Sequence, residues 1–203
     1  MKAYTIKVAL RGVSPMVWRR FSVTADMSLA CLHYIIQIAQ GWNDEYLHQF
    51  HIYGKDYGIA YEGGISFSDD PYQVVLDDFG FDVGARFTYE YDFFENWLHD
   101  IRIEAIHDNS NQKSPFCLNG HREVRESGAS RRGMPGATLT DEIDKTIALL
   151  QTVNKADEST TAGDVRDFIE ALDTVRFNRN KINHQLSKLN LALPVLEPEV
   201  IRL

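Results

Sequence analysis

The stretch LACLHYIIQIAQG, residues 29–41, decides the fold more than any other part of the chain. Its apolar residues recur every three or four positions, which is the spacing of one face of an α-helix. Asp26 or Ser28 can cap the first turn, and Gly41 can take the left-handed conformation that ends a helix. The pattern therefore predicts a helix that begins near Leu29 and ends before Gly41. The predicted buried face consists of Leu29, Leu32, Ile35, Ile36, Ile38 and Ala39.

Segments with a period of two surround this helix and predict strands. Residues 4–10 and 17–23 alternate polar and apolar side chains and are joined through turn residues, which is typical of an antiparallel pair. Further alternating segments follow at residues 47–53, 86–91 and 97–106. A helix among such strands predicts an α+β fold, in which one main helix covers a mixed or antiparallel sheet. The β-grasp topology is one arrangement of this type.

The remaining segments carry weaker signals. Residues 54–70 are rich in Gly, Ser and Asp and predict a long loop or a ragged hairpin, and residues 108–136 look irregular. After these residues the period changes to 3.6, which predicts a helical tail. The predicted helices cover residues 140–153, 161–175 and 178–191. We therefore expect an α+β sheet domain over residues 1–137 and a helical C-terminal extension over residues 138–203, packed on the first domain.

The composition is that of a globular protein without a membrane segment. The chain has 203 residues, 44% of them hydrophobic, and no apolar run near the roughly 20 residues that a membrane span needs. The N-terminus lacks the apolar region of a signal peptide, and two cysteines are too few for a disulfide framework. We therefore expect a cytoplasmic protein that has no membrane partner.

The net charge of −8 is unevenly distributed along the chain. Residues 1–25 hold five basic and no acidic residues, whereas residues 26–108 hold sixteen acidic and three basic residues. Such blocks are usually solvated faces. The functional alternative is an acidic surface around residues 69–82 and 92–100 that meets a basic partner or a metal. We expect a protein partner, because the net charge disfavours nucleic acid.

The strongest candidate site is a group of carboxylates and histidines in the predicted strand region. Asp92, Glu95 and His99 follow closely along the chain, and His48 could join them from an earlier strand. Two carboxylates and an imidazole could bind a divalent metal, or act as acid and base, if the turn between the strands brings them together. The structural alternative is that the carboxylates start the turn by accepting backbone N–H groups. The candidate functional surface is His48, Asp92, Glu95, Trp97 and His99.

Other features give little support for an enzyme. The sequence has no phosphate-binding loop, dinucleotide fingerprint, HExxH motif or GxSxG motif. We therefore assign no catalytic residue and no cofactor, and a divalent metal stays the alternative. His33, on the flank of the predicted helix, is more typical of a buried histidine bonded to a carbonyl or carboxylate than of a ligand. A basic helical face could contact DNA or could simply be solvated; its residues are Arg176, Arg179, Lys181 and Lys188.

Several stretches together form a set of motifs. They are PMVWRR (residues 15–20), LACLHYIIQ (29–37), GWNDEYLHQF (41–50), YEYDFFENWLH (89–99), PFCLNG (115–120) and Phe177-Asn178 with Asn183. This set resembles the plasmid pRiA-type ORF-three-like family, which includes insertion-element passenger proteins of the TnpR-like kind. The chain departs from the family pattern at Tyr46, Phe94 and Glu95, where the family has His, Gly and Asp, and at residues 123–128, which replace the family's PPEDxGG segment.

The resemblance implies an accessory role rather than a reaction. The family name records where the genes lie, and the sequence lacks a serine-recombinase pattern, so resolvase activity is not implied. We expect a non-enzymatic accessory or interaction domain associated with plasmids or mobile elements. A metal-dependent enzyme that uses the Asp/Glu/His group is the alternative, and a DNA-binding accessory protein is a weaker one.

Overall fold

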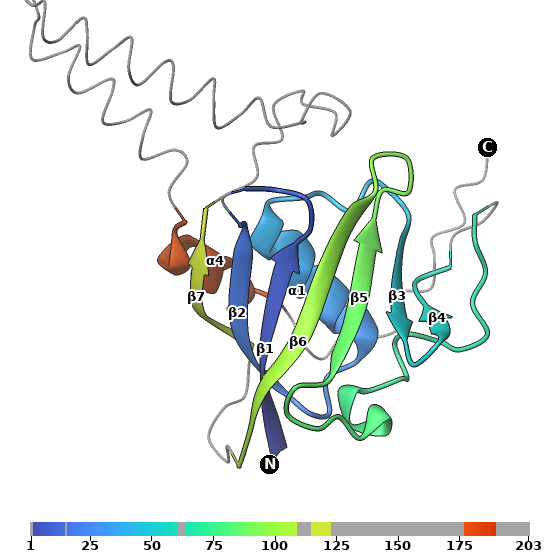
Figure 1. Cartoon of the computed structure of the whole chain (residues 1–203), viewed down its shortest axis with the longest axis horizontal. Helices are drawn as coiled ribbons and strands as arrows, with labels where there is room; N and C mark the ends of the chain where they lie inside the picture. Colours follow the sequence, from blue (N-terminus) through green and yellow to red (C-terminus); the bar gives the residue numbers. More distant parts are fainter. Residues whose placement is uncertain (1, 15, 61–63, 109–114, 123–176, 190–203) are drawn as a thin grey trace, which may run out of the picture.

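Seven strands form one antiparallel sheet in the computed structural model of the chain (Figure 1). The structure describes all residues except 1, 15, 61–63, 109–114, 123–176 and 190–203. The strands are β1 (Lys2–Leu10), β2 (Trp18–Thr24), β3 (His48–Ile52), β4 (Lys55–Tyr57), β5 (Arg86–Tyr91), β6 (Trp97–Asp108) and β7 (Phe116–His121). The helices are α1 (Leu29–Gln40), the 3₁₀ turn η1 (Leu76–Phe79) and α4 (Arg179–Leu186). The strand order is β4-β3-β5-β6-β1-β2-β7, so β1 lies inside the sheet.

Helix α1 packs across one face of the sheet, as Figure 1 shows. Its apolar side chains, among them Leu32 and Ile36, join the core with inward-facing strand residues such as Ile6 and Phe50. The Ser28 hydroxyl oxygen accepts a hydrogen bond from the backbone N–H of Cys31, and Gly41 ends the helix with a φ of 77°. The helix therefore begins and ends where the sequence predicts.

The fold-class prediction is confirmed only in part. The described residues are predominantly β, with a large antiparallel sheet and few helical residues, so α+β describes them poorly. All six strand pairings are antiparallel, and the mixed alternative is therefore wrong for these strands. Their pairings give no particular support to a β-grasp topology. Residues 54–57 open a ragged hairpin, because β4 pairs with β3 over three residues.

Strand β7 corrects the prediction that residues 108–136 are irregular. It pairs antiparallel with β2, and the register shifts between Arg20 and Phe21. That shift breaks the strict alternation by which a strand is recognised in a sequence. Gly120, near the end of β7, also looks like a turn residue when only the sequence is considered.

Helix α4 covers part of the edge of the sheet at β7. The Asn183 side chain accepts a hydrogen bond from the Cys117 N–H at 2.7 Å and donates one to the Cys117 carbonyl at 3.0 Å. At Cys117, one amide side chain thus makes the two hydrogen bonds that a neighbouring strand would otherwise make. Ile182 and Leu186 on the same helix are buried in the core.

The prediction for the helical tail is confirmed only where the structure describes it. Helix α4 is shorter than the predicted helix over residues 178–191. The predicted helices at 140–153 and 161–175, and the proposed boundary after residue 137, lie outside the described residues, so the division into two domains stays a prediction. Among the described helices, none has the length and apolar character to cross a membrane.

Candidate functional site

A closed ring of hydrogen bonds lies between helix α1 and the sheet. The Asp44 N–H donates to Gln37 Oε1 at 3.0 Å, and Gln37 Nε2 donates to the Tyr89 hydroxyl at 2.9 Å. His33 completes the ring, with Nδ1 2.9 Å from the Tyr89 hydroxyl and Nε2 2.8 Å from Asp44 Oδ1. His33 and Gln37 are one helical turn apart on α1, which is why both reach Tyr89 on β5.

The ring determines which nitrogen of His33 carries the proton. The Asp44 carboxylate can only accept, so His33 Nε2 must donate to it. His33 Nδ1 then accepts from the Tyr89 hydroxyl, whose own lone pair accepts from Gln37. Burial lowers the pKa of His33, and it outweighs the opposing effect of the Asp44 carboxylate. The neutral imidazole therefore satisfies every hydrogen bond of the ring.

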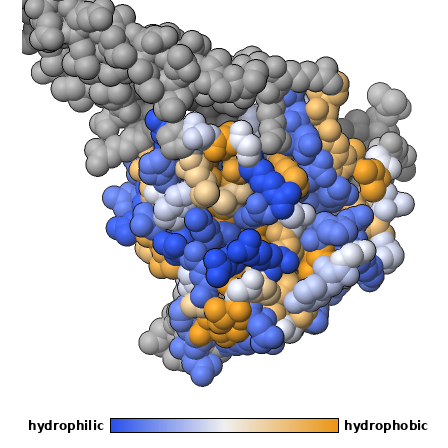
Figure 2. All heavy atoms as spheres, viewed as in Figure 1, coloured by the Kyte–Doolittle hydropathy of each residue, from blue (hydrophilic) through white to orange (hydrophobic). Residues whose placement is uncertain are grey.

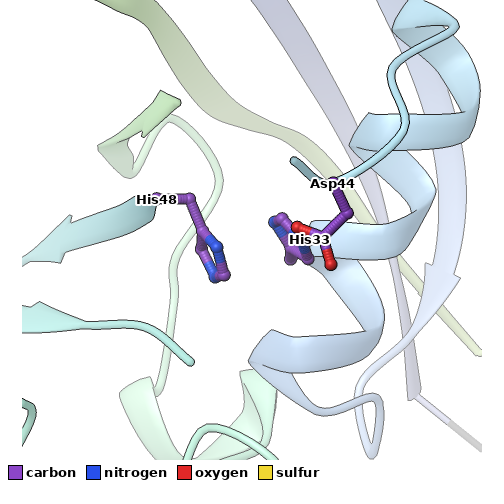
Figure 3. Close-up of side chains that lie close together, drawn as sticks. All are labelled: His33, Asp44 and His48. Atoms are coloured by element: carbon purple, nitrogen blue, oxygen red, sulfur yellow. Dashed lines mark hydrogen bonds and ion pairs between the residues drawn. The ribbon is translucent and has the colours of Figure 1, made fainter. Parts of the chain in front are cut away.

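A second histidine, His48 at the start of β3, stacks on His33 (Figure 3). The ring centroids are 3.6 Å apart and the ring planes differ by 16°. His48 Nε2 accepts a hydrogen bond from the Ile59 N–H at 3.4 Å, while Nδ1 has no hydrogen-bond partner among the described residues. Burial, together with the neighbouring His33, lowers the pKa of His48 to about 2. Two stacked imidazoles can coexist here because both are neutral.

His33, Asp44 and His48 offer ligand atoms that all lie within 4.8 Å of one another, which is close enough for a metal site. Both nitrogens of His33 are already used in the ring. The two imidazoles are also nearly parallel, so the in-plane lone pairs of the rings do not converge on one point, as zinc coordination requires. The arrangement suits a buried hydrogen-bond network better than a metal centre.

The residues of the predicted site lie at the same end of the sheet but have separate partners. Asp92 Oδ1 accepts the N–H groups of Phe94 and Glu95, at 3.1 and 3.3 Å, which is the turn-forming role considered as the structural alternative. His99 is fully buried, donates from Nδ1 to the Trp97 carbonyl, and accepts from Gln40 at Nε2. Among the described residues, neither Asp92 nor His99 belongs to a group that could hold a metal ion.

Aromatic side chains line this end of the sheet. Tyr91 stacks on Trp42 with a centroid distance of 4.6 Å, and Trp97 and Tyr46 flank this pair, each with a centroid distance of 5.9 Å. The side chains of Phe94 and Tyr46 are 70% and 53% exposed. We call these five residues the aromatic edge. Trp42 and Tyr46 lie in the loop between α1 and β3, and Phe94 lies in the turn between β5 and β6. Tyr91 ends β5 and Trp97 begins β6. The loop and the turn both lie at the top in Figure 1.

The predicted basic helical face is described only in part. Arg179 and Lys181 are exposed on α4, and Lys188 is exposed just after it. Arg179 also donates to the Leu118 carbonyl at 3.4 Å, so it helps to hold α4 against β7. Arg176 lies outside the described residues.

These features define a class of protein. It is a small antiparallel sheet domain with a helix across one face. A network of polar side chains is buried between the helix and the sheet, and a group of aromatic side chains reaches the surface. The model of the plasmid pRiA4b ORF-3-like proteins matches residues 2–130, and the chain belongs to that family.

The relatives support the family and the fold but indicate no activity. The chain is 34% identical over 114 residues to the uncharacterized protein y4hQ of Sinorhizobium fredii (strain NBRC 101917 / NGR234). That match covers 56% of this chain and spans 59% of the length of y4hQ. The fold is similar to the crystal structure of MM3350, a protein of unknown function from Methanosarcina mazei Go1, with a TM-score of 0.57 and 25% identity over 78% of this chain and 91% of that one.

The structure confirms the prediction that His33 is a buried histidine bonded to a carboxylate, that of Asp44. The sequence alone did not point to Asp44, Gln37 or Tyr89 as its partners. The signal that could have found them is the set of family motifs. His33 and Gln37 lie in the second stretch of that set, Asp44 in the third and Tyr89 in the fourth. The structure brings these three separate stretches into one ring of hydrogen bonds.

Proposed function

We propose that this chain is a non-enzymatic interaction module that binds a basic polypeptide segment through its aromatic edge. The observation that carries the proposal is the exposure of Phe94 and Tyr46 on neighbouring turns, 70% and 53% respectively. Exposed aromatic side chains gathered in one place are typical of protein interaction sites, where they supply a large share of the binding free energy.

The edge is held in shape before a partner arrives. The Asp92 N–H donates to the Leu47 carbonyl at 2.9 Å and so joins the two turns. The Tyr91 hydroxyl accepts from the Glu45 N–H at 3.0 Å. Stacking among the aromatic rings adds rigidity. A preorganised surface loses less conformational entropy on binding, which favours recognition over incidental exposure.

The charge around the edge favours a basic partner. Residues 41–50 and 87–101 contain no Lys or Arg, and Glu45 and Glu95 lie beside the exposed rings in sequence. Lysine and arginine side chains can pair with these carboxylates and also lie over the aromatic rings. The other acidic stretch, residues 69–82, contributes less, because Asp69 and Asp77 already form ion pairs with Lys55 and Lys2.

Other observations agree with a binding role in a reducing compartment. Both cysteines, Cys31 and Cys117, are free and buried, and burial raises the pKa of each thiol to about 11. Such thiols are poor nucleophiles. Free cysteines also agree with a cytoplasmic setting. The family name supports an association with plasmids, and that part of the proposal rests on the name alone.

The experiment is a binding titration with a defined probe. A fluorescein-labelled peptide of alternating Arg and Leu is titrated with the protein, and the indole N–H signals of Trp42 and Trp97 are followed by NMR. We expect both indole signals to shift, and the double variant Tyr46→Ser/Phe94→Ser to bind about tenfold more weakly, as for loss of interface anchors. A peptide of alternating Glu and Leu is expected not to bind.

The matched control is Ile65→Ser/Val83→Ser, which removes two exposed apolar side chains outside the aromatic edge. It is expected to bind the basic peptide as the natural chain does. Equal weakening in both double variants, or unchanged indole signals at saturation, would contradict the proposal.

A further inference from the structure

A row of basic side chains crosses the face of the sheet opposite α1. In the register of the strands, Arg86 on β5 is opposite Arg102 on β6, Arg102 is opposite Lys7 on β1, and Lys7 is opposite Arg20 on β2. We call these four residues the cation row. At about 4.8 Å per strand, the row is about 14 Å long. Figure 2, which looks onto this face, shows hydrophilic side chains across its middle.

The row is only partly neutralised. On this face Glu104 and Asp100 on β6 pair with Arg20 and with Arg11 from the loop after β1, and Glu90 on β5 accepts a hydrogen bond from Gln49 on β3. In the part of the chain that the structure describes, no ion pair involves Lys7, Arg86 or Arg102. Like charges directly opposite one another on neighbouring strands destabilise a sheet. Glu104 acts electrostatically on Lys7 and Arg102, and Asp100 acts on Arg86, but neither carboxylate forms an ion pair with these residues, so the three aligned cations can still contact a polyanion.

Aromatic side chains flank the row on the same face. Trp18 is two residues before Arg20 on β2, so both project from one side of the sheet, and the Lys7 Nζ and the Arg20 guanidinium each lie 5.0 Å from the Trp18 ring. Phe116 on β7, opposite Ser22, is 45% exposed. Cations that follow a phosphate backbone, beside aromatic rings on which bases stack, are the common elements of single-strand binding surfaces.

We propose that this face binds the phosphate backbone of single-stranded nucleic acid through the cation row, with Trp18 and Phe116 as stacking positions for the bases. The strand is single because stacking needs bases that are free of a complementary strand. This inference is independent of the proposed peptide-binding role, because it uses a different face and different residues. It also differs from the predicted DNA contact by the basic helical face, whose residues are Arg176, Arg179, Lys181 and Lys188.

The test measures the fluorescence anisotropy of a labelled oligonucleotide of about twelve thymidines, titrated with the full chain between about 25 and about 200 mM NaCl. Three phosphate contacts predict a slope of about −2 for log K against log salt concentration. The same sequence as a duplex, and a poly-glutamate peptide, serve as competitors and are expected to compete poorly. No binding at the lowest salt concentration, or equal competition by either competitor, would overturn the proposal.

Two double variants with equal loss of charge locate the contact. Lys7→Gln/Arg102→Gln is expected to weaken binding about tenfold, as for the loss of two phosphate contacts. Lys181→Gln/Lys188→Gln changes the net charge by the same amount at α4 and is expected to change binding less than about twofold. Equal losses in the two variants would assign the binding to overall charge and overturn the proposal. The exposed Arg86→Gln variant is a second test of the row, expected to lose about threefold while its melting temperature stays unchanged.

Discussion

At the scale of single residues, burial decides what His33 and His48 can do. Both imidazoles are almost completely inaccessible to water, and each lies over the face of the other. A charged form of either would lose its hydration and face a second imidazole at 3.6 Å. The histidines therefore act as neutral hydrogen-bonding groups that join α1 to β3 and β5. Hydrogen bonding and stacking between neutral groups also explain why His33, Asp44 and His48 lie close together without the geometry of a metal site.

This protonation state predicts how stability depends on pH. The unfolded chain takes up a proton at His48 below about pH 6.5, whereas in the folded chain the pKa of His48 is lowered to about 2. The stabilisation is therefore complete above about pH 6.5 and decreases as the pH falls, by about 1.4 kcal/mol per pH unit for this residue. Urea unfolding between about pH 7 and pH 5 measures it.

The control for this prediction is His48→Leu, which replaces the imidazole with an apolar side chain of similar size and so removes the titrating group. We expect the pH dependence of the unfolding free energy to be weaker in this variant, while His33 still contributes in the same direction. The same slope in both proteins would show that His48 does not remain neutral in the fold.

At the scale of elements, the edge of the sheet depends on one contact from far along the chain. Asn183 on α4 satisfies both backbone groups of Cys117 on β7, 66 residues earlier. The motifs that resemble the family include both residues, and the structure explains why they occur together. An unprotected edge strand would expose the same N–H and C=O groups to other chains.

We therefore predict that Asn183→Ala destabilises the protein by about 1–3 kcal/mol, because it leaves the two backbone groups of Cys117 without their partners. Urea unfolding gives the free energy, and hydrogen exchange should show faster exchange of the Cys117 amide. The matched control is Asn180→Ala on the same helix, at an exposed position, for which little change is expected. Equal effects of the two substitutions would contradict the role of Asn183.

At the scale of the whole molecule, the charge pattern along the chain becomes a pattern in space. The basic N-terminal residues supply Lys7 and Arg20 to the face of the sheet opposite α1, where Arg86 and Arg102 join them from the acidic region. The acidic residues that remain lie mostly in turns, where Asp70, Asp78 and Asp92 accept backbone N–H groups. The net charge of −8 therefore describes neither the basic face of the sheet nor the acidic turns.

The position of α4 also predicts that the sheet depends on residues beyond the family match. A chain that ends at residue 137 would lose Ile182 and Leu186, which are buried in the core. Each such side chain contributes about 1.5–3 kcal/mol, so we expect the shortened chain to be less stable by about 3–6 kcal/mol in urea. Unchanged stability would instead support an independent domain over residues 1–137. The full-length Ile182→Ala variant is expected to lose about 2–5 kcal/mol of unfolding free energy. It distinguishes the loss of core packing from the removal of the residues after 137.

Much of the fold follows from local patterns. The helix from Leu29 to Gln40, its cap at Ser28 and its end at Gly41 were all predictable, because propensity, capping and periodicity act within a few residues. The alternation in β1, β2, β5 and β6 was equally informative, since it records which side of each strand is buried. The short strand β7 was not predictable in this way, because its register shift interrupts the alternation.

The sequence by itself determined the helix, most of the strands and, through its motifs, the family. Only the tertiary structure decided that His33, Asp44 and Tyr89 meet in one ring, that Asn183 pairs with Cys117, and that Lys7 lies between Arg20 and Arg102. The physical reason is the distance along the chain over which each kind of interaction acts. Periodicity reports the burial of a residue relative to its neighbours in the chain, whereas these contacts depend on the register between strands and on hydrogen bonds between atoms that only folding brings together.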